Sequence, residues 1–312
     1  MRSFSLAVAV LLAGCAQPPG AATTLPAAPA GAQARSVSFT IAQRITPGKK
    51  TELVTFTTLV PRTIPGRQVI RRIDYSVQPD KVFEKHGNTY AVFILDRLDR
   101  PVEVNIRVWA DIFRSDLETL QARGGLAEPE TSEELKRCLR AEKCIECDAG
   151  PIQEAAGRIG GKDRIEQARN VLAFVTSTLR YSSYSKQQKG ALKSLKEKTG
   201  DCTEHADLFV ALCRAKGIPA RTCDGFIMHP PKPGDTARHK WAEVYVEQLG
   251  WVPVDPLLVA RGGASFGRLP NRYVYATHLR NDVLLDNYEM SYYRYHGENI
   301  KFEDSVIVHG RS

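Results

Sequence analysis

Apolar and polar residues alternate along several short runs in the first third of the chain. One run places apolar side chains at every second position, namely Val102, Val104, Ile106, Val108 and Ala110. Successive side chains of a β-strand point to opposite faces, so this spacing gives one apolar face and one mostly polar face. Comparable runs start at Val37 and Val54, and Pro–Gly pairs mark turns between runs. The pattern predicts a β-sandwich over residues 36–112.

The spacing of apolar residues changes after residue 112. Residues 113–160 are rich in charged residues and are predicted to form a helical linker or insert that carries a cluster of cysteines. From Asp163 to Leu179, apolar residues recur at steps of three and four, which predicts a helix with one buried face that ends before Tyr181. Residues 161–312 are assigned to a second domain, so the fold class is expected to be α+β.

The first 35 residues have the features of an exported, lipid-anchored protein. Residues 1–14 contain Arg2 and an apolar run that is too short to span a bilayer, which predicts a signal peptide. The sequence Leu-Ala-Gly-Cys that ends at Cys15 resembles the lipobox of bacterial lipoproteins and implies that Cys15 is acylated. An ordinary signal peptide with a chance cysteine is the alternative. Residues 15–35 are rich in Pro and Ala, which predicts a disordered tether.

The composition is that of a globular protein with a basic surface. The 312 residues include 43% apolar and 25% charged residues, with a net charge of +8, and a chain of this length typically forms about two domains. The charge favours anionic partners, but export and the lack of basic runs with interleaved aromatic residues argue against nucleic acid. No later run reaches the ~18 apolar residues of a membrane helix. We therefore expect attachment to the membrane through the lipid on Cys15, in the bacterial cell envelope and facing the periplasm or exterior.

Seven cysteines are present, and six of them follow Cys15: Cys138, Cys144, Cys147, Cys202, Cys213 and Cys223. An exported protein can form disulfides, but the sequence does not determine which cysteines pair. The first three form a cluster with no fourth ligand at a spacing that suits zinc. A local disulfide in an inserted loop is the favoured interpretation of that cluster.

Residues 200–217 have the start and stop signals of a helix. Asp201 is a predicted N-cap, Glu204 lies at the capping-box position, and Gly217 supplies the stop. Cys202 is then the first helical residue, where the helix dipole and unpaired backbone N–H groups lower the pKa of a thiol. The carboxylates of Asp201 and Glu204 oppose this effect, so a reactive thiolate needs a nearby cation. Without a partner, Cys202 is better explained as a small buried apolar residue.

A histidine 37 positions further on is the candidate partner. Alternation from His239 to Val246 places His239 and Trp241 on one face of a predicted strand and Lys240 on the other. If a second strand ending at Asp255 pairs with the first through a loop with an odd number of residues, His239 and Asp255 lie opposite each other on one face. Asp255 then accepts a hydrogen bond from one ring nitrogen and leaves the other for Cys202. An even loop would break this register.

The three segments GDC, HKWAEVY and GWVPVDP, together with GIPAR after the cysteine helix, resemble the transglutaminase-like superfamily over residues 165–260. The resemblance implies a papain-like core over residues 161–312, with a helix bearing Cys202 packed on an antiparallel sheet bearing His239 and Asp255. It implies that Cys202 is the nucleophile, His239 the general base and acid, and Asp255 the orienting carboxylate. Tyr181 and Trp241 are candidates for an oxyanion or substrate-wall role; for Tyr181 a core position is the alternative.

The resemblance also implies a reaction. The Cys202 thiolate attacks an amide carbonyl, a thioester forms, and water or an amine then resolves it. Hydrolysis is favoured because nothing in the sequence specifies an amine acceptor. The expected substrate is a peptide or protein amide in the envelope, and no cofactor or metal is expected. Thr203 stands where animal crosslinking transglutaminases carry tryptophan, and no acidic cluster has calcium-ligand spacing.

Three other interpretations remain at this stage. A metal site of Cys202, His205 and His239 lacks an obvious fourth ligand. A protein-crosslinking transglutaminase would use the same three residues. A non-catalytic envelope-binding module could use a groove lined by the C-terminal tyrosines, although such tyrosines are more often core residues with solvated hydroxyl groups; they are Tyr273, Tyr275, Tyr288, Tyr292, Tyr293 and Tyr295. The presence of all three candidate catalytic residues favours an enzyme.

Overall fold

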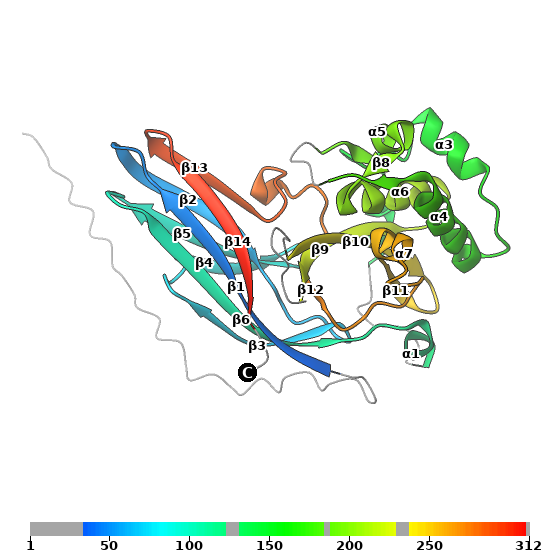
Figure 1. The fold of residues 1–312 in the computed structure, drawn as a ribbon, viewed down its shortest axis with the longest axis horizontal. Coiled ribbons are helices and arrows are strands. Elements are labelled where there is room, and N and C mark those ends of the chain that lie inside the picture. Colours follow the sequence, from blue (N-terminus) through cyan, green and yellow to red (C-terminus); the bar gives the residue numbers. More distant parts are fainter. Residues whose placement is uncertain (1–33, 123–130, 184–187, 229–236, 310–312) are drawn as a thin grey trace, which may run out of the picture.

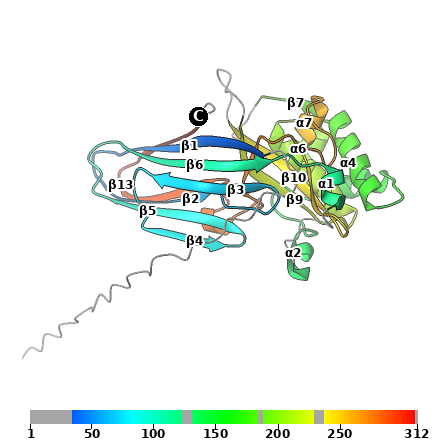
Figure 2. The same ribbon diagram turned by 90° about the horizontal axis from the view of Figure 1, so that it is seen from below.

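Two four-stranded antiparallel sheets face each other at one end of the molecule. The structure is a computed structural model that describes residues 34–122, 131–183, 188–228 and 237–309. Figure 2 shows the two sheets as separate layers. The first has the order β14 (Lys301–His309), β1 (Ala34–Thr46), β6 (Val102–Phe113) and β3 (Gln68–Tyr75). The second has the order β13 (Ser291–Gly297), β2 (Thr51–Val60), β5 (Asn88–Asp96) and β4 (Lys81–Lys85).

The alternating residues of the strands fill the space between the sheets. Val104, Ile106 and Val108 on β6 are fully buried, as the period of two predicts. On the facing sheet, the rings of Phe56 and Phe93 stack with their centroids 4.6 Å apart. Side chains of both inner faces therefore form one apolar core, and the predicted β-sandwich is confirmed.

The sequence-based boundaries of the sandwich were wrong at the C-terminal end. Residues 161–312 were assigned to one catalytic domain, but β13 pairs with β2 and β14 pairs with β1 from Ser38↔His309 to Thr46↔Lys301. Each of these strands lies at the edge of its sheet, and Asp304 interrupts the apolar alternation of β14. An edge strand with a broken pattern gives a weak sequence signal. The helical and second-sheet region is therefore inserted between β6 and β13.

Short helices follow β6 along the chain. They are α1 (Leu117–Ala122), α2 (Ser132–Arg137) and α3 (Gly150–Gly157). The helix predicted between Asp163 and Leu179 is α4 (Arg164–Thr178). Asp163 caps it by accepting a hydrogen bond from the backbone N–H of Glu166 at 2.8 Å.

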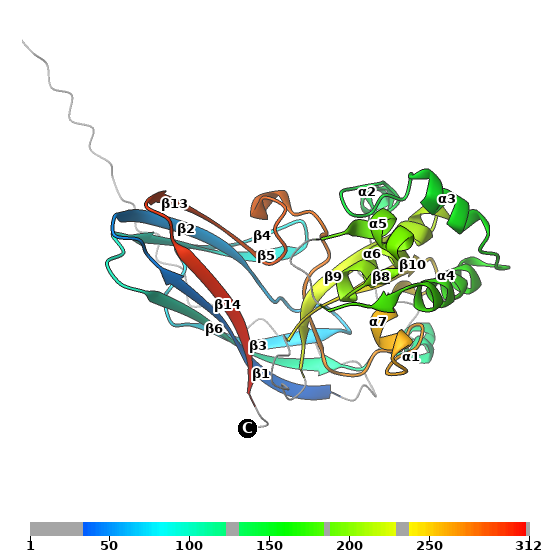
Figure 3. The same cartoon turned by 45° about the horizontal axis from the view of Figure 1, so that its top comes forward.

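The second part of the molecule is built around one buried helix, α6 (Cys202–Ala215), and one antiparallel sheet. The sheet has the order β11 (Gly250–Val254), β10 (Arg238–Val246), β9 (Ala220–Ile227) and β12 (Tyr273–Thr277). Helices α3, α4 and α5 (Gly190–Glu197) surround α6 on the side away from the sheet (Figure 3). The remaining elements are β7 (Arg180–Tyr181), β8 (Thr199–Gly200), α7 (Pro256–Ala260) and the 3₁₀ helix η1 (Val283–Leu285). The α+β class is confirmed.

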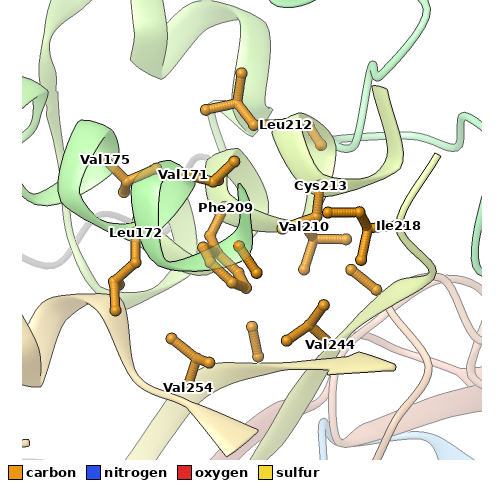
Figure 4. Packing of buried hydrophobic residues seen from close by; sticks show 14 of the residues in the cluster. Val171, Leu172, Val175, Phe209, Val210, Leu212, Cys213, Ile218, Val244 and Val254 are labelled. Atoms are coloured by element: carbon orange, nitrogen blue, oxygen red, sulfur yellow. The ribbon is translucent and has the colours of Figure 1, made fainter. Parts of the chain in front are cut away.

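Apolar side chains join α6 to α4 and to the sheet. Figure 4 shows Phe209 and Val210 of α6 between Val171 of α4 and Val244 and Val254 of the sheet. The spacing of Phe209, Leu212 and Cys213 predicts one buried face, but every residue from position 204 to 214 is buried. Because helices cover the remaining sides of α6, its polar residues are buried too, which its apolar periodicity does not reveal.

The sandwich and the inserted part share a continuous interface. Phe226 and Val274, from β9 and β12, belong to the apolar core of the sandwich. Polar contacts flank them, because the hydroxyl of Tyr90 donates to the Asp282 carboxylate at 2.6 Å and the amide of Gln68 donates to the carbonyl of Tyr275 at 2.9 Å. The sheet that carries β10 is therefore supported from behind by the sandwich.

None of the six cysteines that the structure describes forms a disulfide. The expected local disulfide among Cys138, Cys144 and Cys147 is therefore not formed. All three side chains are buried, so these cysteines serve as small core residues. Cys15 lies outside the described residues. Among the described helices, none is both long and apolar enough to span a lipid bilayer.

Candidate active site

Cys202 is the first residue of α6, as its capping signals predict. The Asp201 carboxylate accepts from the backbone N–H of Thr203 at 2.8 Å, and the Glu204 carboxylate accepts from the N–H of Asp201 at 3.0 Å. This capping box fixes the start of the helix. Cys202 is partly exposed, whereas the other five described cysteines are buried. Its thiol is therefore the one that a substrate can reach among these six.

His239 lies at the start of β10 and its Nε2 donates to Oδ2 of Asp255 at 2.7 Å. β10 and β11 pair from Ala242↔Val254 to Val246↔Gly250, so residues 247–249 form a loop with an odd number of residues. Continuing this register places Asp255 opposite Trp241. The expectation that His239 and Asp255 lie directly opposite each other is therefore wrong by two residues. Because the offset is even, both side chains still lie on one face and meet diagonally.

His239 also interacts with Cys202, and this interaction raises the pKa of His239. Nε2 is occupied by Asp255, which leaves Nδ1 as the ring nitrogen for the sulfur. Burial lowers the pKa of His239, but the charge and hydrogen bond of Asp255, together with Cys202, outweigh burial and raise the pKa of His239 to about 10. The imidazole is thus protonated at neutral pH. It supplies the cation that a thiolate at Cys202 needs beside Asp201 and Glu204.

Asp255 is fully buried and accepts two further hydrogen bonds. The hydroxyl of Tyr273 donates to Oδ2 at 2.5 Å, and the backbone N–H of Leu258 donates to Oδ1 at 2.8 Å because Asp255 is the N-cap of α7. Burial raises the pKa of Asp255, but His239 and these donors outweigh it and lower that pKa. Sequence reasoning missed this role of Tyr273, because only the tertiary fold brings the hydroxyl of Tyr273 from β12 to Asp255 after β11.

Trp241 does not line a substrate wall. Its side chain is fully buried, with the rings of Tyr273 and Tyr275 edge-on at 5.0 and 4.7 Å. Its own ring is nearly parallel to that of His239, with the centroids 6.2 Å apart. Trp241 therefore supports the imidazole from behind. Alternation placed it correctly on the face of His239 but could not show that this face is covered.

Tyr181 is 54% exposed and lies on β7, which pairs Tyr181 with Gly200 two residues before Cys202. The guanidinium of Arg261, just after α7, lies over the Tyr181 ring at 4.2 Å. The pair therefore connects the segment before Cys202 with the segment after Asp255. The core position considered for Tyr181 is excluded by its exposure. Its role towards a substrate stays a prediction.

His205 is buried and faces its own helix. Its Nδ1 lies 2.7 Å from the carbonyl oxygen of Asp201, and burial lowers the pKa of His205, which favours the neutral form. Within the described ranges, the one group with metal-ligand spacing is Cys223, Glu243 and His278, and not the set of Cys202, His205 and His239. Arg221 already pairs with the Glu243 carboxylate at 2.8 Å, so its positive charge opposes a cation there.

The C-terminal tyrosines do not form one groove. Tyr273 and Tyr275 are buried in the sheet of the second part, whereas Tyr292 and Tyr293 pack on the core of the sandwich. Tyr288 is exposed and stacks on Tyr292 at 5.5 Å. The residues grouped by the sequence are therefore distributed over different parts of the fold.

Comparison with known proteins gives a family match for the central segment of the chain. Residues 153–256 match the transglutaminase-like superfamily, which confirms the resemblance inferred from the three sequence segments. The comparison with curated proteins finds no match.

Solved structures show a similar fold. A candidate cysteine protease from Cytophaga hutchinsonii is 18% identical in sequence and has a TM-score of 0.61, with 90% of this chain and 94% of that chain covered. At this identity the similarity concerns the fold, and it includes the sandwich as well as the core. The periplasmic domain of TgpA from Pseudomonas aeruginosa is 14% identical over 71% of this chain and 89% of that chain. Its TM-score of 0.36 is too low to support an argument.

Proposed function

We propose that the protein is a transglutaminase-like cysteine enzyme that cleaves amide bonds through a thioester on Cys202. One observation carries the proposal: a partly exposed thiol at a helix start shares the imidazole of His239 with the buried carboxylate of Asp255. The helix dipole and the imidazolium both favour the thiolate. A structural cysteine needs none of these features.

In the proposed reaction, the Cys202 sulfur forms a bond to the carbonyl carbon of the substrate amide. Collapse of the tetrahedral intermediate breaks the C–N bond, and the imidazolium of His239 gives its proton to the leaving amine. Water then attacks the thioester, neutral His239 accepts a proton from that water, and the thiolate leaves with the imidazolium restored. Asp255 keeps the ring oriented throughout.

The backbone N–H of Cys202 is the proposed oxyanion donor. The first N–H groups of a helix have no carbonyl partner within the helix, so they point towards the solvent or a ligand. Loss of one such donor typically lowers the rate by ~100-fold or more. The capping box holds the N–H of Cys202 in place, because it fixes the residues on either side of the helix start.

The proposal includes a location and a substrate class. The lipobox-like sequence at Cys15 supports a lipid anchor in a bacterial envelope, and the Pro- and Ala-rich sequence that follows it supports a tether. The proposed substrate is therefore a peptide or protein amide of the envelope. Hydrolysis is preferred to crosslinking because water needs no binding site of its own.

The test is to trap the acyl-enzyme with envelope peptides and measure the mass added to Cys202. We expect a covalent adduct in the wild type that is absent from Cys202→Ala, and turnover that is abolished in both Cys202→Ala and His239→Ala. Asp255→Asn is expected to lower turnover without unfolding the protein. Adding an amine such as glycine ethyl ester separates the alternatives, since a crosslinking enzyme would transfer the acyl group to the amine. Turnover that persists in Cys202→Ala would exclude the mechanism.

A further inference from the structure

A chain of buried and partly buried charged side chains connects the cysteine helix to the histidine strand. Asp207 lies on α6, five residues after Cys202, and Arg280 donates to both of its carboxylate oxygens at 2.8 and 3.0 Å. Their side chains are 0% and 1% exposed. Planar, bidentate contacts of this kind fix the relative orientation of the two groups.

The other end of the chain is Lys240, which directly follows His239. Its ammonium group contacts Asp224 at 2.8 Å and Glu289 at 3.0 Å. Glu289 also lies 3.9 Å from the guanidinium of Arg280, so it joins the lysine to the arginine. The sequence placed Lys240 away from the His239 face, and the structure agrees, but it also shows what the buried ammonium group contacts.

Gln188 connects this chain of charges to the start of α6. Its amide donates to Glu289 at 3.2 Å and its carbonyl oxygen accepts from Arg280 at 3.2 Å. The next residue, Lys189, donates its backbone N–H at 3.2 Å to Glu204, the capping-box residue that holds Asp201. Two neighbouring residues, Gln188 and Lys189, therefore contact these charged side chains and the cap of α6.

We propose that Asp207, Arg280, Glu289 and Lys240 form a positioning network that holds the start of α6 against β10 and thereby sets the contact between Cys202 and His239. The inference rests on the function proposed above. None of the four residues touches the reacting atoms, so they act through the two backbones that carry the catalytic pair.

The cost of burying charge supports this role. Replacing buried ion pairs with apolar residues is often neutral or stabilising, so stability alone gives little reason to keep such a network. Geometry gives a better reason, because a misplacement of about 1 Å can lower a reaction rate by ~100-fold. The network bonds to α6 at one end and to β10 at the other, which are the two elements whose spacing matters.

The experiment measures the alkylation rate of Cys202 by iodoacetamide as a function of pH. Site-specific mass spectrometry separates Cys202 from the five other described cysteines, none of which forms a disulfide. The variants are Glu289→Gln and Asp207→Asn, which keep the side-chain shape but remove one negative charge. The control is Glu243→Gln, which removes a buried carboxylate from β10 that pairs with Arg221 but has no contact with the network. Thermal unfolding verifies that each variant is folded.

The direction in which the pH midpoint of Cys202 alkylation changes distinguishes an electrostatic effect from a positioning effect. Removing a negative charge favours the thiolate through space, so a purely electrostatic effect lowers the pH midpoint of alkylation. A displaced His239 stabilises the thiolate less, so the positioning network predicts a higher midpoint, by about one pH unit, and a rate at pH 6 that is lower by about tenfold. We expect this rise in Glu289→Gln and Asp207→Asn and no rise in Glu243→Gln.

Two results would contradict the positioning network. A midpoint in folded Glu289→Gln at or below the wild-type value overturns the network, as does an equal rise in Glu243→Gln. The Glu289 side chain is 29% exposed, so this variant carries the test if Asp207→Asn does not fold. Failure of the proposed function would appear separately, as turnover of envelope peptides that persists in Cys202→Ala.

Discussion

At the scale of single residues, the site depends on how one buried carboxylate is satisfied. Asp255 accepts from His239, from the hydroxyl of Tyr273 and from the N–H of Leu258. These three donors fix the direction in which the carboxylate points and keep it charged despite its burial. The imidazole is therefore held at Nε2 and presents Nδ1 to the sulfur.

The raised pKa of His239, about 10, predicts the alkaline limit of activity. The imidazolium must give its proton to the leaving amine, so kcat/KM is expected to remain high below that pH and to fall as pH rises through about 10. Asp255→Asn removes the largest contribution that raises this pKa, so its alkaline limb is expected at lower pH. The measurement is the pH profile of kcat/KM for both proteins. An unchanged limb in a folded Asp255→Asn protein would contradict the assignment.

The same pKa shift affects stability with a defined sign. Because the pKa of His239 is raised in the folded state, its contribution is fully present below the ordinary histidine pKa of about 6.5 and is lost as pH rises through about 10. We expect the wild type to lose stability relative to His239→Gln between pH 7 and 10. Urea unfolding at several pH values measures this difference. A stability difference that stays constant between pH 7 and 10 would show that the imidazole is neutral in the folded protein.

Two substitutions distinguish the possible roles of Tyr181. If its exposed ring forms a substrate wall, Tyr181→Phe keeps nearly full activity and Tyr181→Ala raises KM. If the hydroxyl donates to the oxyanion, Tyr181→Phe alone lowers kcat by ~100-fold or more. The stacked position of Arg261 on the ring favours the wall. Steady-state kinetics of both variants decides between the two, and full activity of both would remove Tyr181 from the site.

At the scale of elements, the capping box makes the start of α6 a precise position. The side chains of Asp201 and Glu204 satisfy backbone N–H groups on both sides of Cys202. The rest of the helix is buried among α3, α4, α5 and the sheet, so it cannot tilt without disturbing a packed core. The cap and the packing therefore act together to place the thiol.

Asp201→Ala is expected to lower the free energy of unfolding by ~1 kcal/mol, the usual effect of losing an N-cap. Thr131→Ala is the matched control, because Thr131 and Glu134 form a second capping box on the short, largely exposed helix α2. Fraying of that helix exposes little core, so its effect is expected to be smaller. Urea unfolding compares the two variants. An equal loss in the free energy of unfolding would show that the burial of α6 does not increase the contribution of its N-cap to stability.

At the scale of the whole molecule, the sandwich is made from both ends of the described chain. Strands β1 to β6 come before the inserted core, and β13 and β14 come after it. The two closing strands bring partly buried residues such as Phe302 and Val306 against the sandwich core. The catalytic part is therefore held at both of its ends by the same two sheets.

Deleting residues 291–312 is expected to abolish cooperative unfolding and cause aggregation. The deletion removes β13 and β14, so β1 and β2 become unpaired edges and part of the sandwich core is exposed. Deleting only residues 310–312 is the control, since β14 ends at His309. Thermal unfolding and size-exclusion chromatography compare the two proteins. A soluble, cooperatively unfolding protein without residues 291–312 would contradict this account of the sandwich.

The sequence predicted those parts of the structure that depend on local patterns. Alternation identified the sandwich core around Ile106, the capping residues identified the start of α6, and the even separation of His239 and Asp255 placed them on one face. Features that depend on contacts between distant segments were not predictable. The burial of Trp241, the hydroxyl of Tyr273 on Asp255 and the return of β14 to β1 all require the tertiary arrangement.

The pairing of Ser38 with His309 has a consequence for how the protein is made. The amino-terminal end of a chain leaves the ribosome first. Strands β1 and β2 therefore emerge long before β13 and β14, which complete their sheets. Over that interval the nascent sandwich has two unprotected edges, while the intervening segment already has every residue needed for its own sheet. We therefore expect the catalytic part to acquire structure first, and chaperones that shield unpaired strands to determine the yield.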